Sequence, residues 1–323
     1  MKKIIFLLLP VLFLTVFIYY IALKELNKKI NSMSNYCNSI NNYDGISVVK
    51  FKDCGLGNQM FIYAFGKILE KNTKTKVFFE KDELDNSKTN RKFCLDKMNT
   101  KMDIISKSAV QNLNLKTIDF VGTKEARSVD LSIIKSTGNY IYYGHWENPN
   151  WGYTQILKEL YEDFSVKEDL DKKNSDMLKK IQKTNSVALN FRVNNPKTDD
   201  SSFISLGKKY YKNAMDYISS KVKNPHYYIF SERQDLCKEI LDLKETKHTF
   251  VNINDDSKNY LDMNLMKNCK HNITSYSTFS WWGAFLNKNA NKIVTLPKGE
   301  WYKNINLTGK NLFFKGCKFI SIN

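Results

Sequence analysis

The sequence has few of the residues from which metal sites are built, and it has none of their usual spacings. Its 323 residues include six cysteines and four histidines, with no Cys-x-x-Cys and no His-x-x-x-His pair. A single Asp-x-Asp at 169–171 lies in a charged stretch, where a solvated helix face is the simpler explanation. We therefore predict no metal and no cofactor. The cysteine count permits disulfides without requiring them.

Arginine is also scarce, because only four of the 50 basic residues are arginine. The net charge is +17, but the lysines are scattered along the whole chain. No basic segment with interleaved aromatic residues stands out, and such a segment is typical of proteins that bind nucleic acid. We therefore predict that nucleic acid is not a partner. The charge is better explained by a general bias of composition toward lysine.

One long apolar run stands at the N-terminus. Residues 4–23 contain no charge, and this length is sufficient to cross a bilayer as a helix. A cleaved signal peptide would have a shorter apolar region followed by small residues, whereas tyrosines and a Lys-Glu pair stand here. We predict a short tail (1–3), an uncleaved transmembrane anchor (4–23) and a polar stem (24–45). The protein would then be a single-pass membrane protein, Golgi-type in a eukaryote and inner-membrane or virus-associated otherwise.

The rest of the chain alternates short apolar strands with helical patterns, which is the order of a parallel α/β sheet. The predicted strands are 46–51, 76–80, 139–143, 186–191, 227–231, 249–252, 272–276 and 292–296. The predicted helices are one following the glycine turn to about residue 70, then 154–164, 208–221, 234–241, 259–267 and 280–286. A lysine-rich stretch around 165–185 joins two doubly wound, Rossmann-like domains, 46–180 and 181–323.

Four polar segments fall at the ends of predicted strands. They are 54–59, 190–195, 231–232 and 275–280. In open parallel sheets, ligands bind beyond the carboxyl ends of the strands. The agreement among the four segments indicates a ligand site at these ends.

The first of these segments, GLGNQ, opens a predicted helix. Gly55 and Gly57 would let backbone amides approach a ligand without interference from Cβ, and Asn58 and Gln59 add amide donors and acceptors. The third glycine of the dinucleotide fingerprint is absent, and so is the Lys-Ser/Thr of a P-loop. The alternative is a tight turn in which Asn58 caps the helix.

The last segment, STFSWW, combines hydroxyl groups with the start of another helix. Its hydroxyls, Ser277, Thr278 and Ser280, and the backbone amides there favour an anion. The tryptophans Trp281 and Trp282 could stack on a base or a sugar, but tryptophan pairs belong more often to the core.

The two remaining segments offer charged side chains. Arg192, at the end of a strand, can hold a pyrophosphate with two hydrogen bonds and stabilise a leaving nucleotide. A surface ion pair is the alternative. Glu232 can accept hydrogen bonds from a ribose or a base, whereas Ser231 can simply cap the next helix.

Three stretches of this sequence resemble a known family. They are GLGNQMFIYAFGKIL, YIFSERQDLCKE and MKNCKHNITSYSTFSWWGAFLNKNANKIVTLP, and they resemble the fucosyltransferases of glycosyltransferase family 11, the α-1,2-fucosyltransferase group. The resemblance covers about Val48 to Trp301. It implies a GT-B architecture with two domains facing across a cleft. It also implies metal-independent, inverting transfer of fucose from GDP-fucose to a galactose-type hydroxyl of a glycan.

The resemblance also assigns the two sides of the site. It implies that the C-terminal domain binds the nucleotide sugar and that the loop Gly55, Gly57, Asn58 and Gln59 reaches over from the acceptor-side domain. The donor-side candidates are Asn190, Arg192, Asn195, Ser231, Glu232, Ser277, Thr278, Phe279 and Ser280.

The chain departs from the family pattern at one motif. Where the family has His-x-Arg-Arg-x-Asp, this chain has Asn190, Arg192, Val193 and Asn195, so only the first arginine is kept. That arginine is the one expected on the β-phosphate. The departure leaves two alternatives open: a transferase that uses another nucleotide sugar, and a catalytically weakened homologue that binds glycans.

The acceptor side offers two candidates for the proton transfer. Glu147 and His145 lie in the segment YYGHWENPNW, just beyond the end of a predicted strand. Ordinary loop polarity explains both equally well, so the sequence names them only as candidates.

Overall fold

The structure is a computed structural model that describes residues 21, 23–24, 42–52, 54–86, 91–120, 131–192, 206–299 and 312–322. The predicted tail, nearly all of the predicted anchor and most of the stem lie outside the described residues, and so does Asn195. Within the described ranges, no helix is both long enough and apolar enough to cross a membrane.

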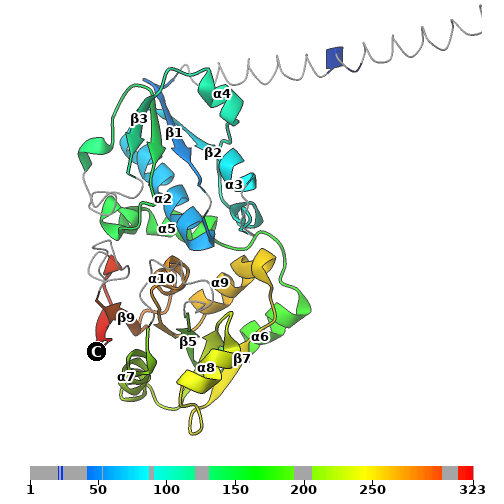
Figure 1. The fold of residues 1–323 in the computed structure, drawn as a ribbon, viewed down its shortest axis with the longest axis vertical. Coiled ribbons are helices and arrows are strands. Elements are labelled where there is room, and N and C mark those ends of the chain that lie inside the picture. The colour runs from blue at the N-terminus through cyan, green and yellow to red at the C-terminus, as the bar shows by residue number, and fades with distance from the viewer. Residues whose placement is uncertain are drawn as a thin grey trace, which may run out of the picture.

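The first unit is built on a parallel sheet in the order β2-β1-β4-β3 (Figure 1). Its strands are β1 (Ile46–Lys50), β2 (Lys76–Glu80), β3 (Lys116–Asp119) and β4 (Tyr140–Tyr143). Its helices are α2 (Leu56–Asn72), α3 (Asp82–Asp85), α4 (Lys107–Gln111) and α5 (Leu157–Asp163), with 3-10 turns at Leu95–Lys97, Leu131–Ile133, Pro149–Trp151 and Tyr153–Ile156.

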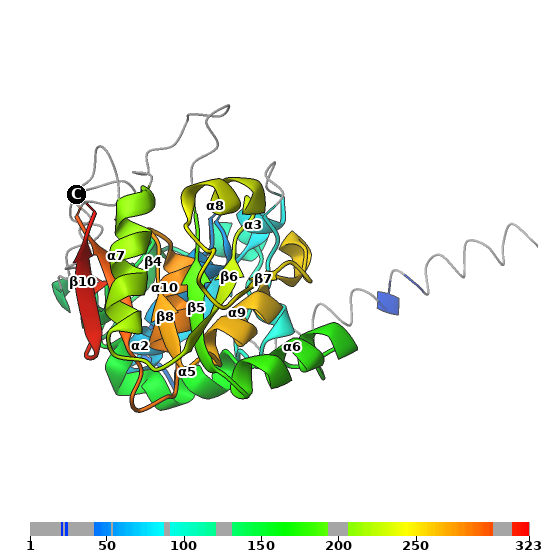
Figure 2. The ribbon, with the colours of Figure 1, turned by 90° about the horizontal axis from the view of Figure 1, so that it is seen from below.

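The second unit is built on a larger parallel sheet in the order β10-β9-β8-β5-β6-β7 (Figure 2). Its strands are β5 (Asn185–Asn190), β6 (Pro225–Phe230), β7 (His248–Val251), β8 (His271–Ile273), β9 (Val294–Lys298) and β10 (Cys317–Ser321). Its helices are α6 (Lys172–Gln182), α7 (Lys208–Ser219), α8 (Gln234–Ile240), α9 (Asn259–Lys267) and α10 (Thr278–Phe285), with a 3-10 turn at Asp256–Lys258. The prediction of two parallel α/β units is confirmed.

Each sheet has a point at which the order of its strands reverses. In the first sheet the chain builds β2 on one side of β1 and β4 on the other, and in the second it builds β6 on one side of β5 and β8 on the other. Ligands of open parallel sheets bind beyond the carboxyl ends of the strands at such switch points. The GLGNQ loop follows β1, and Arg192 follows β5, so both predicted segments lie at these points.

The helix α2 lies between the two units and is buried on nearly all sides, which is why its sequence is apolar around most of its circumference. It packs on β1 and β2 of its own sheet and on α10 of the other unit (Figure 1). At that contact, the ring of Phe61 lies 4.9 Å from Trp281 and 4.8 Å from Trp282, between ring centroids. Both tryptophans are fully buried, so the core explanation of the tryptophan pair is confirmed.

The structure differs from the expected elements mainly at the sheet edges and between the units. The edge strands β3 and β10 have no counterpart among the predicted strands, because β3 is largely exposed, β10 buries only Ile320, and neither shows a clear apolar alternation. The predicted lysine-rich connection contains the helix α6, which packs on α9 and β5 of the second unit. The predicted boundary at 180/181 falls inside α6, so the second unit begins near Asp171, the residue that caps this helix.

The segment 275–280 is also placed differently from the expectation. The strand β8 ends at Ile273 and α10 already begins at Thr278, so the serines and threonine occupy a short loop and the first helical turn.

Gly57 sets how closely α2 and α10 approach, which leads to a prediction on stability. A Cβ atom on Gly57 would lie 2.4 Å from the backbone nitrogen of Phe279 and 2.6 Å from the carbonyl carbon of Thr278. We expect Gly57→Ala to lower the free energy of unfolding by about 1–3 kcal/mol, because backbone must move to admit the methyl group. Chemical denaturation of the purified protein measures the change.

Gly55→Ala is the matched control, because a Cβ there meets nothing within 4 Å and the φ of Gly55 is −70°. We expect it to change stability by no more than about 0.5 kcal/mol. Equal stability of the two variants would contradict the close approach of the two helices.

Candidate functional site

The two switch points face each other and meet at Asn58. This residue is the third of α2, and its side chain points out of the helix toward the other unit. Its Oδ1 accepts a hydrogen bond of 2.6 Å from the hydroxyl of Thr278, at the start of α10. Its Nδ2 lies 3.3 Å from Nδ1 of His145, in the loop after β4. The cap of α2 is Gly55, so Asn58 does not serve as the helix cap.

The indole of Trp282, in the middle of α10, lies against the same loop. The Nε1 of Trp282 donates a hydrogen bond of 2.9 Å to the carbonyl oxygen of Gly57. The GLGNQ loop and the STFSWW segment, which the sequence places far apart, are therefore in direct contact.

Arg192 stands at the carboxyl end of β5, beside the loop that follows β8. Its Nη1 donates to Oγ of Ser277 over 3.4 Å, and its backbone N–H donates to the hydroxyl of Tyr211 over 3.2 Å. At the last residue of the same strand, the side chain of Asn190 accepts a hydrogen bond of 2.5 Å from the hydroxyl of Ser275. These bonds fix the two strand ends on either side of the switch point.

Two helices present their N-termini at this place without a side-chain cap. Ser277 is the N-cap residue of α10, but its hydroxyl makes no capping bond and is directed to Arg192 instead. Gly55 cannot cap α2 with a side chain, and neither helix has an acidic residue in its first turn. Uncapped N–H groups and the helix dipole attract anions. Together with the guanidinium, they form a site suited to a diphosphate.

The remaining residues of the STFS segment shape the loop or stand at its surface. The Ser280 hydroxyl donates to the carbonyl oxygen of Ser277 and accepts from the backbone N–H of Ser275, and the residue is fully buried. Phe279 is half-buried and packs on the core. Thr278 is half-buried and holds Asn58, as described above.

Gln59 points away from the site, into the first unit. Its Nε2 donates to the carbonyl oxygens of Cys54 and Lys92, and its Oε1 accepts from the N–H of Cys94. Its exposed fraction is 0%, so the amide ties two loops together within the domain. Gly55 lies at the start of this loop with open space beside it.

The loop after β4 holds His145 and Glu147 in different environments. His145 is half-buried, whereas Glu147 is 1% exposed. Between them, Trp146 has a left-handed backbone with φ of 55°, which a bulky residue rarely adopts. Burial raises the pKa of the Tyr153 phenol, and the charge of Glu147 adds to this rise, so the carboxylate lies near that ring. Glu147 is therefore placed inside the domain.

Ser231 and Glu232 follow β6, the strand next to β5 on the side away from β8. The Ser231 hydroxyl accepts from the backbone N–H of Arg233 over 3.0 Å, which closes the turn before α8. Arg233 itself is the residue at the cap position of α8. Glu232 is exposed. Both residues thus lie, like Arg192, beyond the carboxyl ends of the strands.

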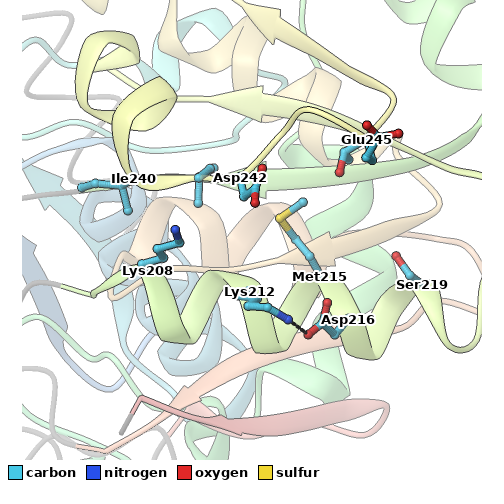
Figure 3. Close-up of a pocket in the computed structure, with 10 residues that line it drawn as sticks. Lys208, Lys212, Met215, Asp216, Ser219, Ile240, Asp242 and Glu245 are labelled. Atoms are coloured by element: carbon cyan, nitrogen blue, oxygen red, sulfur yellow. Dashed lines mark hydrogen bonds and ion pairs between the residues drawn. The ribbon is translucent and has the colours of Figure 1, made fainter.

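A cavity of about 340 Å³ lies elsewhere, between α7 and the connection from α8 to β7 (Figure 3). Its lining contains none of the predicted site residues. Two lysines and three carboxylates line it, and Lys212 is paired with Asp216. Because the charges are of both signs, this cavity does not offer a diphosphate the positive environment that the switch point offers.

Two residues of the site escaped sequence reasoning. Ser275 stands in the same polar segment as Ser277, so its position was visible there, but its pairing with Asn190 was not. Nothing in the sequence indicated that Tyr211 contacts Arg192, because a tyrosine in a predicted helix is most simply assigned to the core. In the part of the chain that the structure describes, no group of three or more His, Cys, Asp or Glu residues could hold a metal ion.

Comparison with known proteins gives a consistent picture. The family model described as "Glycosyl transferase family 11" matches residues 48–316. An alpha-1,2-colitosyltransferase of Escherichia coli is 26% identical over 271 residues, which cover 77% of this chain and 90% of that protein. The O-antigen biosynthesis glycosyltransferase WbnK of Escherichia coli is 28% identical over 297 residues, covering 78% of this chain and 94% of that protein.

Other matches are shorter or more distant. The human galactoside alpha-(1,2)-fucosyltransferase 1 is 28% identical over 97 residues, covering 29% of this chain and 27% of that protein. Among solved structures, a mutant of Arabidopsis thaliana FUT1 in complex with GDP has a TM-score of 0.44 at 12% identity, covering 82% of this chain and 73% of that chain.

The bonds of Gln59 lead to a prediction that separates a structural role from ligand contact. Gln59→Leu removes the Gln59 partner of the buried carbonyl oxygen of Cys54 and of the buried N–H of Cys94, and also the bond to the carbonyl oxygen of the exposed Lys92. We expect the free energy of unfolding to fall by about 2–4 kcal/mol, since each orphaned buried group costs about 1–3 kcal/mol. Gln111→Leu, at an exposed position, is the control. A destabilisation no larger than the control's would refute the structural role.

Proposed function

This chain belongs to glycosyl transferase family 11 and is a glycosyltransferase, and we propose that it transfers fucose from GDP-fucose to a galactose-type hydroxyl of a glycan, with inversion at the sugar carbon. The observation that carries the proposal is the meeting of two uncapped helix N-termini with Arg192 at the switch points. A nucleoside diphosphate is the ligand that satisfies this charge.

In the proposed reaction, the acceptor oxygen forms a bond to the anomeric carbon of fucose as the bond from that carbon to the phosphate oxygen breaks. The leaving GDP takes the electron pair, so negative charge grows on its β-phosphate. In this proposal, Arg192 and the N-terminus of α10 stabilise this charge, which the bond between Arg192 and the cap residue Ser277 supports. This positive environment would replace a divalent cation, so the proposed reaction requires no metal.

In this proposal, the altered motif around Arg192 supports the loop that carries Ser277. Asn190 occupies the position of the family's histidine, and its side-chain carbonyl accepts from Ser275. The bond ties the end of β5 to the loop after β8, and so holds Arg192 beside Ser277. We assign Asn190, Ser275, Ser280 and the buried Ser277, which holds Arg192, to the support of this loop, and Thr278 to its ligand-facing side.

The acceptor would approach from the first unit, past Asn58 and the loop that carries His145. We assign Glu147 a supporting role, because a carboxylate that is 1% exposed is shielded from an acceptor hydroxyl. An oxocarbenium-like transition state reacts with weakly activated hydroxyls, so the acceptor proton can pass to water. Ser231 and Glu232 stand where a ribose or base extending along the strand ends could meet them.

A different nucleotide sugar is the second candidate, and two observations favour it. The motif around Arg192 has lost its second arginine and its histidine. A relative that aligns with most of the chain is a colitosyltransferase, and colitose is fucose without its 3-hydroxyl.

A membrane anchor at 4–23 remains a proposal that rests on the uncharged run alone.

The central role of Arg192 gives the first functional prediction. Arg192→Lys keeps the charge but loses the planar fork that holds two phosphate oxygens. We expect turnover, measured as release of GDP in the presence of acceptor, to fall by about 100–1,000-fold. Stability should hardly change, because Arg192 is exposed. Arg233→Lys, at the exposed pair with Asp235, is the matched control and should keep full turnover. Full turnover of Arg192→Lys would refute the assignment.

Donor choice and metal independence are tested together. GDP-fucose and GDP-colitose are supplied separately, each with and without EDTA, and GDP release is measured. We expect turnover of GDP-fucose that EDTA leaves unchanged, because the chain supplies the positive charge itself. Turnover of GDP-colitose alone would favour the second candidate. Loss of activity in EDTA that Mg²⁺ or Mn²⁺ restores would contradict the metal-free reaction.

A further inference from the structure

The Asn58 amide is held between a hydroxyl on one unit and an imidazole on the other. Thr278 donates to its Oδ1 over 2.6 Å, and its Nδ2 lies 3.3 Å from Nδ1 of His145. The amide has one acceptor end and one donor end, so the identity of each neighbour decides which end it meets.

The two distances fix the orientation of the amide. A contact of 2.6 Å falls in the range of O–H···O bonds and is shorter than the roughly 2.7–3.2 Å of N–H···O bonds. The oxygen of Asn58 therefore faces Thr278, and its NH₂ group faces His145. An N–H donor requires a lone pair on Nδ1 of the imidazole, so neutral His145 carries its proton on Nε2.

We propose that Asn58 is a positioning residue that holds His145 as the Nε2–H tautomer, so that His145 presents a hydrogen-bond donor, and not a base, to the acceptor. The role of His145 toward the acceptor rests on the proposed function, whereas its tautomer follows from the geometry alone. Through Thr278, the same amide joins the helix that would bind the donor to the histidine on the acceptor side.

The backbone around each member of this chain of contacts is fixed independently. Trp146, next to His145, is stacked on Phe65 with 3.7 Å between ring centroids, and its carbonyl oxygen accepts from the hydroxyl of Tyr153 over 2.6 Å. On the other side, the bond from Trp282 to Gly57 holds α2 against α10. The packing of the core therefore fixes the positions of Asn58, Thr278 and His145. Their contact is set by the fold and not by the chance orientation of surface side chains.

The tautomer has a chemical consequence for the reaction. Nε2–H can donate to a ring or hydroxyl oxygen of a glycan and so orient it, but it has no lone pair with which to remove a proton. Glutamine places an N–H group near the position of Nε2 and cannot act as a base. His145→Gln therefore separates an orienting role from a basic one.

The first experiment measures the tautomer without any substrate. The chain has four histidines, so ¹H–¹⁵N correlation spectra of the imidazoles can be assigned with single His→Gln variants. At mildly alkaline pH, we expect His145 to show a protonated Nε2 and an unprotonated Nδ1. Asn58→Asp offers only acceptors to both neighbours, so it should move the proton of His145 to Nδ1. Thr278→Val removes the hydroxyl that orients the amide and should leave a mixture.

A protonated Nδ1 in the unaltered protein, or a tautomer that Asn58→Asp leaves unchanged while the fold is retained, would overturn the proposal. Melting temperatures establish that each variant is folded. Because no donor or acceptor is present, this result is independent of whether the protein uses GDP-fucose.

The second experiment is kinetic. We expect His145→Gln, which keeps an N–H donor, to leave kcat and the KM for the acceptor within about threefold. His145→Ala, which removes the donor, should raise KM for the acceptor by about 3–10-fold, the value of one hydrogen bond. A fall in kcat of about 100-fold or more, the loss expected for a general base, would overturn the orienting role. If neither the unaltered protein nor the variant turns over GDP-fucose, the proposed function fails while the tautomer result still stands.

Discussion

The close approach of α2 and α10 is the constraint on which the rest of the structure depends. Two helix N-termini of like partial charge are brought together, and neither carries a side-chain cap or an acidic residue in its first turn. The absence of a Cβ on Gly57 allows the approach, and buried aromatic rings around Phe61 stabilise it. The arrangement concentrates positive potential between the units, which the proposed anionic ligand would relieve.

The chemistry of the site follows from how that potential is supplemented. Arg192 adds a full charge on the same side, directed by a serine that has given up its usual capping role. Asn190, which stands where the family has a histidine, contributes a hydrogen bond with Ser275 instead of charge. The protein thus retains one strong electrostatic group and a rigid frame around it, which is consistent with a glycosyltransferase that relies on few charged side chains.

Much of this architecture could be predicted from local patterns. The strands with continuous apolar runs and the helices that follow them were recognisable, because burial on both faces leaves a clear signature. Elements at the edges were not recognisable: β3 is largely exposed, β10 buries only Ile320, and α6 buries only Asn174, Met177 and Ile181 among lysines. The role of Gln59 could not be predicted either, because an amide beside two glycines can bind a ligand or hold a buried loop equally well.

By itself, the sequence determined the class of the fold, the family, and the strand ends at which a ligand would be held, because those follow from periodicity and from short motifs. The tertiary structure decided which of the motif residues meet. Asn58 and Thr278 stand 220 positions apart in the sequence, so no local sequence pattern predicts that they are in contact. Their contact, and the proton it places on His145, depend on the packing of one whole unit against the other through the buried aromatic core.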